Sequence, residues 1–305
     1  MSKIEWTEQT YNPIIGCSKI SEGCRNCYAE KTAARLGNIP ATREDYSHVV
    51  LWGTDTAGMY TCIPQWNGKT HLVESALDKP LRRKKPTVYF VCSMGDLFHE
   101  NNKTEWILRV WSIMAQCPQH IFLVLTKRSH VMYDLMPCIQ GNGSCEFDVD
   151  GEATPSYQWP QWPLPNVYLG VTVENSDATP RIEDVINTEA AKRFISIEPM
   201  LEEIDITPWV ENIDQVIVGG ESGPNARPMH PDWVRSIRDQ CEEAGTPFFL
   251  KQWGKWLPLA GADEASQYPD AILHEWPDGN RSVQAGKKKA GRKLDGRTHD
   301  KLIWK

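Results

Sequence analysis

The chain has 305 residues, of which 40% are hydrophobic and 24% charged, a composition typical of a globular protein with a substantial buried core. It contains no run of eighteen apolar residues and no apolar leader, so we expect no membrane attachment and a cytoplasmic location. The formal net charge of −7 excludes nucleic-acid binding through overall charge alone.

The N-terminal segment combines a weak strand signal with closely spaced cysteines. The stretch "TYNPIIGC" predicts a first strand, although Pro13 interrupts it. Cys17, Cys24 and Cys27 follow with the spacing C-x6-C-x2-C, and "YAEKTAARLG" then predicts a helix that ends at Gly37. In a cytoplasmic protein such cysteines are more often thiols or metal ligands than disulfides.

Six short apolar runs, rich in β-branched and aromatic residues, follow along the chain. Continuous runs of this kind indicate strands buried on both faces of a parallel sheet. Helical patterns separate several of them, including "TEWILRVWSIMAQC" and "PDWVRSIRDQCEEAG". The alternation predicts an α/β fold: a single-domain, TIM-barrel-like parallel βα-repeat barrel over residues 1–305, partly or fully closed. The runs cover residues 87–94, 120–127, 166–173, 192–199, 214–221 and 247–253.

Two segments depart from this rhythm. Residues 137–165 are rich in Pro, Gly and Trp, and we expect them to form an excursion or ordered lid. Residues 281–305 form a basic C-terminal tail with nine Lys or Arg against two Asp. Such a tail is either a phosphate-binding arm or a solvated surface, and the sequence favours neither.

A charged residue stands at the end of each apolar run. In parallel βα barrels the carboxyl ends of the strands meet at one rim, where active sites lie. The set therefore favours a shared polar cavity, while ordinary turn residues remain an alternative for any single member. The six residues are Asp96, Lys127, Glu174, Glu198, Glu221 and Lys251.

Three neighbouring thiols are too few for a structural zinc site, which four protein ligands normally close. Three thiolates on a four-iron cluster would leave one iron open to the amine and carboxylate of a small molecule. Two other interpretations remain: zinc with a fourth ligand such as Cys62 or His71, and thiols without a metal.

These motifs resemble the radical S-adenosylmethionine superfamily, and in particular its phage-associated three-cysteine-motif branch. The resemblance lies in "GCSKISEGCRNCYAE", "SMGDLFHE", "ISIEPMLEEID", "VIVGGESGPNARPMHPDWVRSIRDQC", "FFLKQWG" and "AGRKLDGRTHD", which together span nearly the whole chain. The superfamily's usual spacing is C-x3-C-x2-C, so the first loop is longer here. The resemblance implies a cluster-binding loop in which Cys17, Cys24 and Cys27 hold a 4Fe-4S cluster, with S-adenosyl-L-methionine as the second cofactor.

The resemblance also implies roles for residues at the strand ends. Cleavage of S-adenosylmethionine by an electron from the cluster would give a 5′-deoxyadenosyl radical that abstracts hydrogen from a substrate. Gly95 and Asp96 would hold the methionine amino group, and Glu174 the ribose hydroxyls. The remaining expected residues are Tyr28 and Ser93 at the cofactor and Lys127, Glu198, Glu221 and Lys251 at the substrate.

The expected substrate is a nucleic-acid base or a nucleotide, in modification or repair, because the basic tail suits phosphates and the thirteen tryptophans suit stacking on bases. A small-molecule or peptide substrate fits the charged strand ends equally well. Expected partners are an electron donor of the flavodoxin or ferredoxin type and, by resemblance, a three-cysteine-motif partner protein. A different class of function also fits the sequence: a zinc-stabilised binding or partner module that catalyses no reaction.

Overall fold

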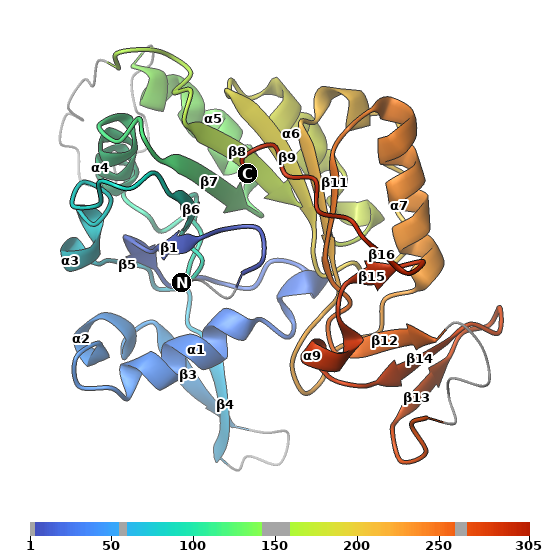
Figure 1. Ribbon diagram of the computed structural model, residues 1–305. Helices are drawn as coiled ribbons and strands as arrows, with labels where there is room; N and C mark the ends of the chain where they lie inside the picture. The colour runs from blue at the N-terminus through green and yellow to red at the C-terminus, as the bar shows by residue number, and fades with distance from the viewer. Residues whose placement is uncertain (1–3, 55–59, 142–158, 260–266) are drawn as a thin grey trace. The chain divides into compact units, whose positions relative to one another are not determined.

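The computed structural model describes residues 4–54, 60–141, 159–259 and 267–305 (Figure 1). The chain divides into two compact units. Unit 1 comprises residues 1–21, 27–171 and 184–192, and unit 2 comprises residues 22–26, 172–183 and 193–305. Each unit is described by itself, and a single domain over 1–305 stays a prediction. Of the expected excursion at 137–165, residues 142–158 lie outside the described residues.

Short parallel strands form the sheet of unit 1. Val88 pairs with Ile121 and Phe122 with Val167, and the helices that follow two of the strands are α4 (Thr104–Ala115) and α5 (Ser129–Gln140). Three of the predicted runs match strands to within three residues at either end. The strands of this sheet are β1 (Gln9–Tyr11), β6 (Val88–Val91), β7 (Ile121–Thr126) and β8 (Val167–Thr172).

Unit 2 continues the same pattern with β9 (Lys192–Ile197), β10 (Gln215–Gly219) and β11 (Phe248–Gln252). Helix α7 (Pro231–Ala244) connects β10 to β11 and is capped by Gly245, which adopts φ +71°, a conformation that favours glycine. All five residues of β10 are buried, as expected for a central strand covered on both faces.

The strand order is β1-β6-β7-β8 in unit 1 and β9-β10-β11 in unit 2, and neighbouring strands within each unit pair parallel. The predicted α/β fold with a parallel βα-repeat sheet is therefore confirmed. Among the described strands β1 and β11 are not paired with each other, which corresponds to the partial form of the predicted barrel. None of the helices in these ranges combines the length and the apolar character that a bilayer crossing requires.

The N-terminal region of unit 1 differs from the single strand expected there. Pro13 separates β1 from β2 (Ile14–Ile15), which turns away to pair antiparallel with β5 (His71–Leu72). Beside them a small core includes Ile15, Ala33 and Val49. The other elements here are α1 (Tyr28–Gly37), α2 (Arg43–Tyr46), the antiparallel pair β3 (Val50–Thr54) and β4 (Tyr60–Trp66), and α3 (Glu74–Leu77).

The C-terminal region of unit 2 is folded and packs on the edge strand β11. The backbone N–H of Leu250 donates to the carbonyl of His299 at 3.1 Å, and the Trp304 ring lies 5.7 Å from that of Phe194. The hydrogen bond to His299 covers part of the β11 edge, which would otherwise expose hydrogen-bonding groups, and Trp304 packs on a residue of β9. The elements are β12 (Trp256–Leu259), β13 (Leu273–Glu275), β14 (Arg281–Gln284), α9 (Lys287–Ala290), β15 (Lys293–Leu294) and β16 (Arg297–Thr298).

Four short helices complete the described elements. Three are 3-10 turns, and the fourth follows β8 as a two-turn α-helix that begins at a proline, a residue favoured in the first turn. They are η1 (Glu22–Cys24), η2 (Ser176–Ala178), α6 (Pro180–Asn187) and η3 (Val210–Asn212).

Candidate metal and cofactor site

The first cysteine of the motif follows a close backbone contact with the turn after β6. Gly16, at φ +91°, forms a parallel bridge with Gly95, and its N–H donates to the carbonyl of Met94 at 3.0 Å. A Cβ on Gly95 would lie 2.9 Å from the Gly16 oxygen, closer than such contacts allow. Gly95 therefore allows a close backbone approach, and the approaching group is Gly16. Cys17 is thereby held at the carboxyl end of β6.

Cys27 is tied to the same turn through its neighbour. Tyr28, the first residue of α1, donates its hydroxyl hydrogen to the carbonyl of Ser93 at 2.9 Å, while the ring stays exposed. Ser93 is in turn held by its hydroxyl, which donates to Oδ1 of Asn12 at 3.0 Å. Two cysteines of the motif thus stand beside residues that contact one short turn, 93–95.

Asp96 connects the ends of β6 and β7. Its Oδ1 accepts from the Thr126 hydroxyl at 2.7 Å and the Phe98 N–H at 3.0 Å. Its Oδ2 accepts from the Lys127 N–H at 3.2 Å and from Arg128 at 3.3 Å. A carboxylate offers about four acceptor positions, so this buried group is fully used by protein donors. Its role at a methionine amino group stays a prediction.

Lys127 directly follows β7, as the sequence indicates, and its side chain is half-buried. Its Nζ lies 3.4 Å from the hydroxyl oxygen of Ser21, which belongs to the cysteine loop. The ammonium group therefore lies beside the loop within unit 1.

In unit 2 the segment that bears Cys24 is bound to the turn after β10. The amide of Asn26 donates to Oε2 of Glu221 at 3.0 Å, and the Arg227 guanidinium donates to the Glu22 carbonyl at 2.9 Å. Arg227 also donates to both oxygens of Glu221, at 2.7 and 3.0 Å. Glu221 and Arg227 thus hold the segment on both sides of Cys24.

The electrostatics of this cluster favour an ionised Glu221. Burial would raise the pKa of its carboxyl group, but the hydrogen bonds from Arg227 and Asn26 outweigh burial and lower the pKa below its ordinary value. The same contact raises the pKa of Arg227, because its bond to Glu221 stabilises the cation. The pair is therefore fully charged at neutral pH.

The other strand-end charges of unit 2 are also paired. Glu174 follows β8, is completely buried and accepts from Arg181 at 2.8 Å. Glu198 follows β9 and accepts from Nζ of Lys251, with its two oxygens at 2.7 and 2.9 Å. Lys251 itself lies within β11, one residue before the strand ends. The contact of Glu174 with ribose stays a prediction, as do the contacts of Lys127, Glu198, Glu221 and Lys251 with substrate.

The three motif cysteines differ from the other cysteines described. Cys17, Cys24 and Cys27 are half-exposed thiols. Cys92, Cys117 and Cys241 are buried, and burial raises the pKa of each thiol, that of Cys241 to about 12. Cysteine binds metals as the thiolate, so these three buried cysteines are suited to packing in the core as neutral thiols. The half-exposed set has the donor chemistry that an iron–sulfur cluster requires, and the cation Arg128 lies 3.6 Å from the Cys17 sulfur.

Several residues of these clusters have no counterpart among the sequence expectations. Arg128, Arg181 and Asn12 each bond a predicted site residue or its neighbour. The only sequence signal for Arg128 is its place beside Lys127 at the strand end, and Asn12 similarly follows β1 directly. Arg181 lies in α6, and from the sequence alone it would be assigned to the solvent-exposed face of that helix.

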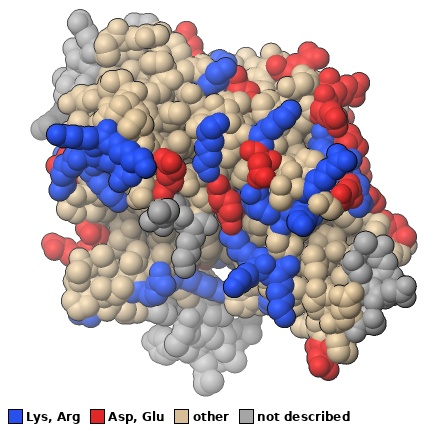
Figure 2. Space-filling view, in the orientation of Figure 1, with Lys and Arg blue, Asp and Glu red and all other residues tan. Residues whose placement is uncertain are grey.

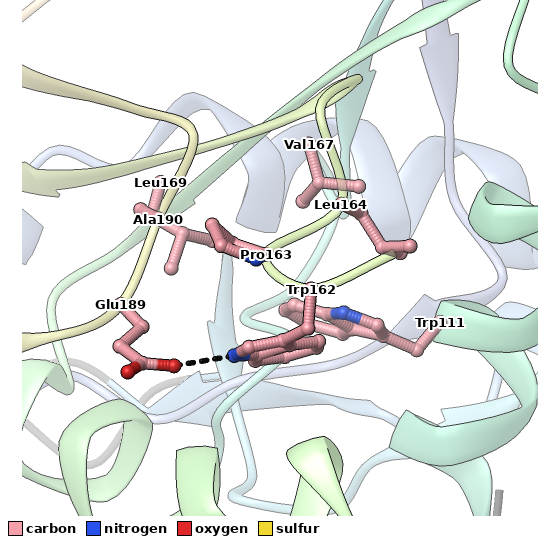
Figure 3. A pocket seen from close by; sticks show the side chains of 8 residues that line it. All are labelled: Trp111, Trp162, Pro163, Leu164, Val167, Leu169, Glu189 and Ala190. Carbon is pink, nitrogen blue, oxygen red and sulfur yellow. Dashed lines mark hydrogen bonds between the residues drawn. The ribbon is translucent and has the colours of Figure 1, made fainter. Parts of the chain in front are cut away.

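Two further features do not extend the site. His230, Asp232 and Asp278 lie close enough for a cation, but Nδ1 of His230 accepts the Asp232 N–H as the cap of α7 and Nε2 lies 3.0 Å from Asp278. In unit 1, Trp111 and Trp162 line a cavity of about 10 Å³, enough for a single water molecule (Figure 3). The bond from Trp162 Nε1 to Glu189, at 2.6 Å, borders it.

The fold and the clusters define an α/β protein with a parallel βα-repeat sheet and a cysteine-bearing loop at a strand's carboxyl end. Over residues 1–303 the chain matches the family described as protein of unknown function (DUF5131), and it belongs to that family. A search of curated proteins found no match.

Solved structures offer only a distant likeness. A variant of spore photoproduct lyase is 10% identical, with 94% of this chain and 71% of that chain covered and a TM-score of 0.39. Another variant, with bound AdoMet and dinucleoside spore photoproduct, is 10% identical over 90% and 67% of the two chains, with a TM-score of 0.39. A complex of the same lyase with dinucleoside spore photoproduct has a TM-score of 0.38 at 10% identity and 92% and 69% coverage. Likeness at this level supports no argument about this chain.

Proposed function

We propose that this chain is a radical S-adenosylmethionine enzyme in which Cys17, Cys24 and Cys27 hold a 4Fe-4S cluster. When bound, the cluster and S-adenosylmethionine together supply a 5′-deoxyadenosyl radical that abstracts hydrogen from a substrate. The protein's part is to hold the cysteines, orient the second cofactor and shield the reaction from water.

One observation carries the proposal: two half-exposed cysteines are anchored to a single turn at a strand's carboxyl end. Gly16 bridges Gly95 beside Cys17, and Tyr28 bonds Ser93 beside Cys27. Ligands and reacting groups in parallel βα sheets bind at this end of the strands. The cysteines are therefore anchored where a small-molecule cofactor would meet the residues of the strand ends.

The turn 93–96 is the proposed place for the methionine part of the cofactor. Because Asp96 is saturated by protein donors, we assign it to holding this turn against β7. The methionine amino group would then donate to backbone carbonyls of the turn, since each carbonyl oxygen has two lone pairs. Glu174 remains the proposed partner of the ribose hydroxyls, and Lys127, Glu198, Glu221 and Lys251 remain the candidates that face substrate.

The proposed substrate is a nucleic-acid base or nucleotide. Its support is the charge of the C-terminal region, where Lys287, Lys288 and Lys289 are exposed on α9. Figure 2 shows Lys and Arg side chains gathered over this helix. Such a group supplies the sequence-independent attraction for phosphates that a chain with net charge −7 otherwise lacks. A flavodoxin or ferredoxin-type electron donor and a three-cysteine-motif partner protein complete the proposal.

The test is anaerobic purification and reconstitution with iron and sulfide, followed by metal analysis, reduction and incubation with S-adenosylmethionine. About four irons per chain with release of 5′-deoxyadenosine is the expected result. Stoichiometric zinc in a colourless protein would overturn it and favour the non-catalytic binding module. Co-purification with tagged chain, analysed under the same anaerobic conditions, tests the partner protein.

A further inference from the structure

Arg128 is a buried cation beside the first motif cysteine. It stands between the end of β7 and the first residue of α5, and only 1% of its side chain is exposed. Its guanidinium donates to Sγ of Cys17 at 3.6 Å. A fully buried charge is costly unless its partners satisfy it, so the position calls for a specific set of acceptors.

The acceptors account for the whole donor set of this side chain. Nε donates to Glu100 at 2.7 Å, and one terminal nitrogen donates to Asp96 at 3.3 Å as well as to Cys17. The other terminal nitrogen donates to the carbonyl and the hydroxyl oxygen of Ser18, at 3.3 and 2.7 Å. An arginine side chain has five N–H groups. Each of the five is directed at an acceptor, and one of them at the cysteine sulfur.

The surrounding groups fix the orientation of the guanidinium. Asp96 is itself held by Thr126 and by backbone N–H groups, so it cannot turn away. The hydroxyl oxygen of Ser18 also lies 2.9 Å from Nε2 of His99. Burial would lower the pKa of Arg128, but Asp96, Cys17 and Glu100 raise it, which keeps the group a cation. The N–H aimed at Cys17 is thus preorganised.

We propose that Arg128 is the positioning residue that holds the Cys17 ligand and raises the reduction potential of the cluster. The inference rests on the proposed function. Reduction adds negative charge to an iron–sulfur cluster, and hydrogen bonds to its sulfurs and nearby charges are what set its potential. A fixed cationic donor at one sulfur stabilises the reduced state more than the oxidised state. Arg128 therefore eases delivery of the electron that the proposed reaction needs.

Two substitutions should move the potential in opposite directions. R128Q removes the positive charge at Cys17 and should lower the ratio of reduced to oxidised cluster about tenfold at a fixed applied potential, equivalent to about 59 mV for a one-electron couple. E100Q removes the half-exposed negative charge that pairs with Nε of Arg128 and should raise the ratio. R109Q is the matched control, because it removes the same charge on α4, where the Arg109 guanidinium pairs with the exposed carboxylate of Glu74.

The experiment is a potentiometric titration of reconstituted protein, followed by visible absorption and electron paramagnetic resonance, with thermal unfolding measured in parallel. Opposite shifts in R128Q and E100Q, with R109Q at the wild-type value, would support the role. Equal potentials in wild type and E100Q, or shifts of the same sign in both variants, would overturn it while the proposed function stands. E100Q keeps Arg128 and so does not depend on whether R128Q folds. A wild-type chain that binds no iron would overturn both proposals.

Discussion

Glu198 and Lys251 form an ion pair that passes over the end of β10, because the strand between theirs ends in a glycine. Nζ of Lys251 lies 2.7 and 2.9 Å from the two carboxylate oxygens, and both side chains are largely buried. A Cβ at Gly219 would lie 3.1–3.2 Å from the Glu198 side chain. Because Gly219 has no side chain, the Glu198 carboxylate has space to reach Lys251.

The substitution G219A should therefore destabilise the protein through Glu198. The added methyl group would push the carboxylate from Lys251, and overpacking of this kind costs about 1–3 kcal/mol. Thermal or urea unfolding measures the loss. In an E198A background the atoms that the methyl meets are gone, so the same G219A change should cost little. Equal costs in the two backgrounds would show that Gly219 has another role.

The strands and their charged ends follow from local sequence, and most of them could be predicted. Runs such as 214–221 are short, apolar and bounded by turn residues, and β10 occupies Gln215–Gly219. Lys127 and Glu198 directly follow their strands because a charge cannot continue a doubly buried strand. Lys251 lies inside β11, where pairing with Glu198 offsets its burial.

Contacts between distant residues could not be predicted in this way. Arg128 and Cys17 lie 111 positions apart, and no local pattern connects them. The sequence indicated Asp96 as a cofactor-binding residue because three of its four protein donors, on Thr126, Lys127 and Arg128, come close only through the pairing of β6 with β7. The three-residue strand β13 is too short to show a period, so the C-terminal antiparallel sheet could not be predicted either.

Acid should weaken the cluster that holds the Cys24 segment. The folded-state pKa of Glu221 lies below its ordinary value of 4.5, so its contribution to stability is complete above about pH 4.5 and is lost as the pH falls through the folded pKa. E221Q should lower stability at pH 7, and its difference from wild type should shrink on acidification. Urea unfolding at a series of pH values measures this difference.

E275Q is the control for that series, because Glu275 belongs to the same unit and its ion pair with Arg281 is exposed. Exposed pairs contribute about 0–1 kcal/mol, so E275Q should follow the wild-type curve. A difference between wild type and E221Q that stays constant from pH 7 to pH 3 would contradict the role assigned to the Glu221 carboxylate.

Loss of any motif cysteine should abolish iron binding. C17A, C24A and C27A each remove one thiolate of the proposed set, and reconstitution should leave close to no iron on any of them. C241A is the matched control, because Cys241 is a buried thiol in α7 with a raised pKa. Metal analysis of the four variants beside wild type gives the result. Full iron retention in any one motif variant would remove that residue from the ligand set.

Anchoring of the Cys24 segment should matter in the same assay. N26A removes the amide that donates to Glu221 at 3.0 Å and to the carbonyl of Asn225 at 2.9 Å. Removal of a group that orients metal ligands typically lowers metal affinity about 10–100-fold. Competition with an iron chelator measures the decrease, and N280A, a change in the same unit at an exposed turn, serves as the control. Equal chelator resistance in N26A and wild type would show that Asn26 does not support metal binding.

Nucleic-acid binding, if it supplies the substrate, should depend on the lysines of α9. The plot of log affinity against log salt has a negative slope. For each phosphate that the protein no longer neutralises, the magnitude of this slope decreases by roughly 0.9 for duplex DNA and 0.7 for single strands. The triple variant K287A/K288A/K289A should therefore show a shallower slope than wild type in fluorescence anisotropy with labelled DNA or RNA. The control K79A/K84A/K85A removes three exposed lysines from the connection between α3 and β6 in unit 1, and should keep the wild-type slope. Equal slopes in both triple variants would mean that α9 is a solvated surface, and a flat salt response in wild type would count against a nucleic-acid substrate.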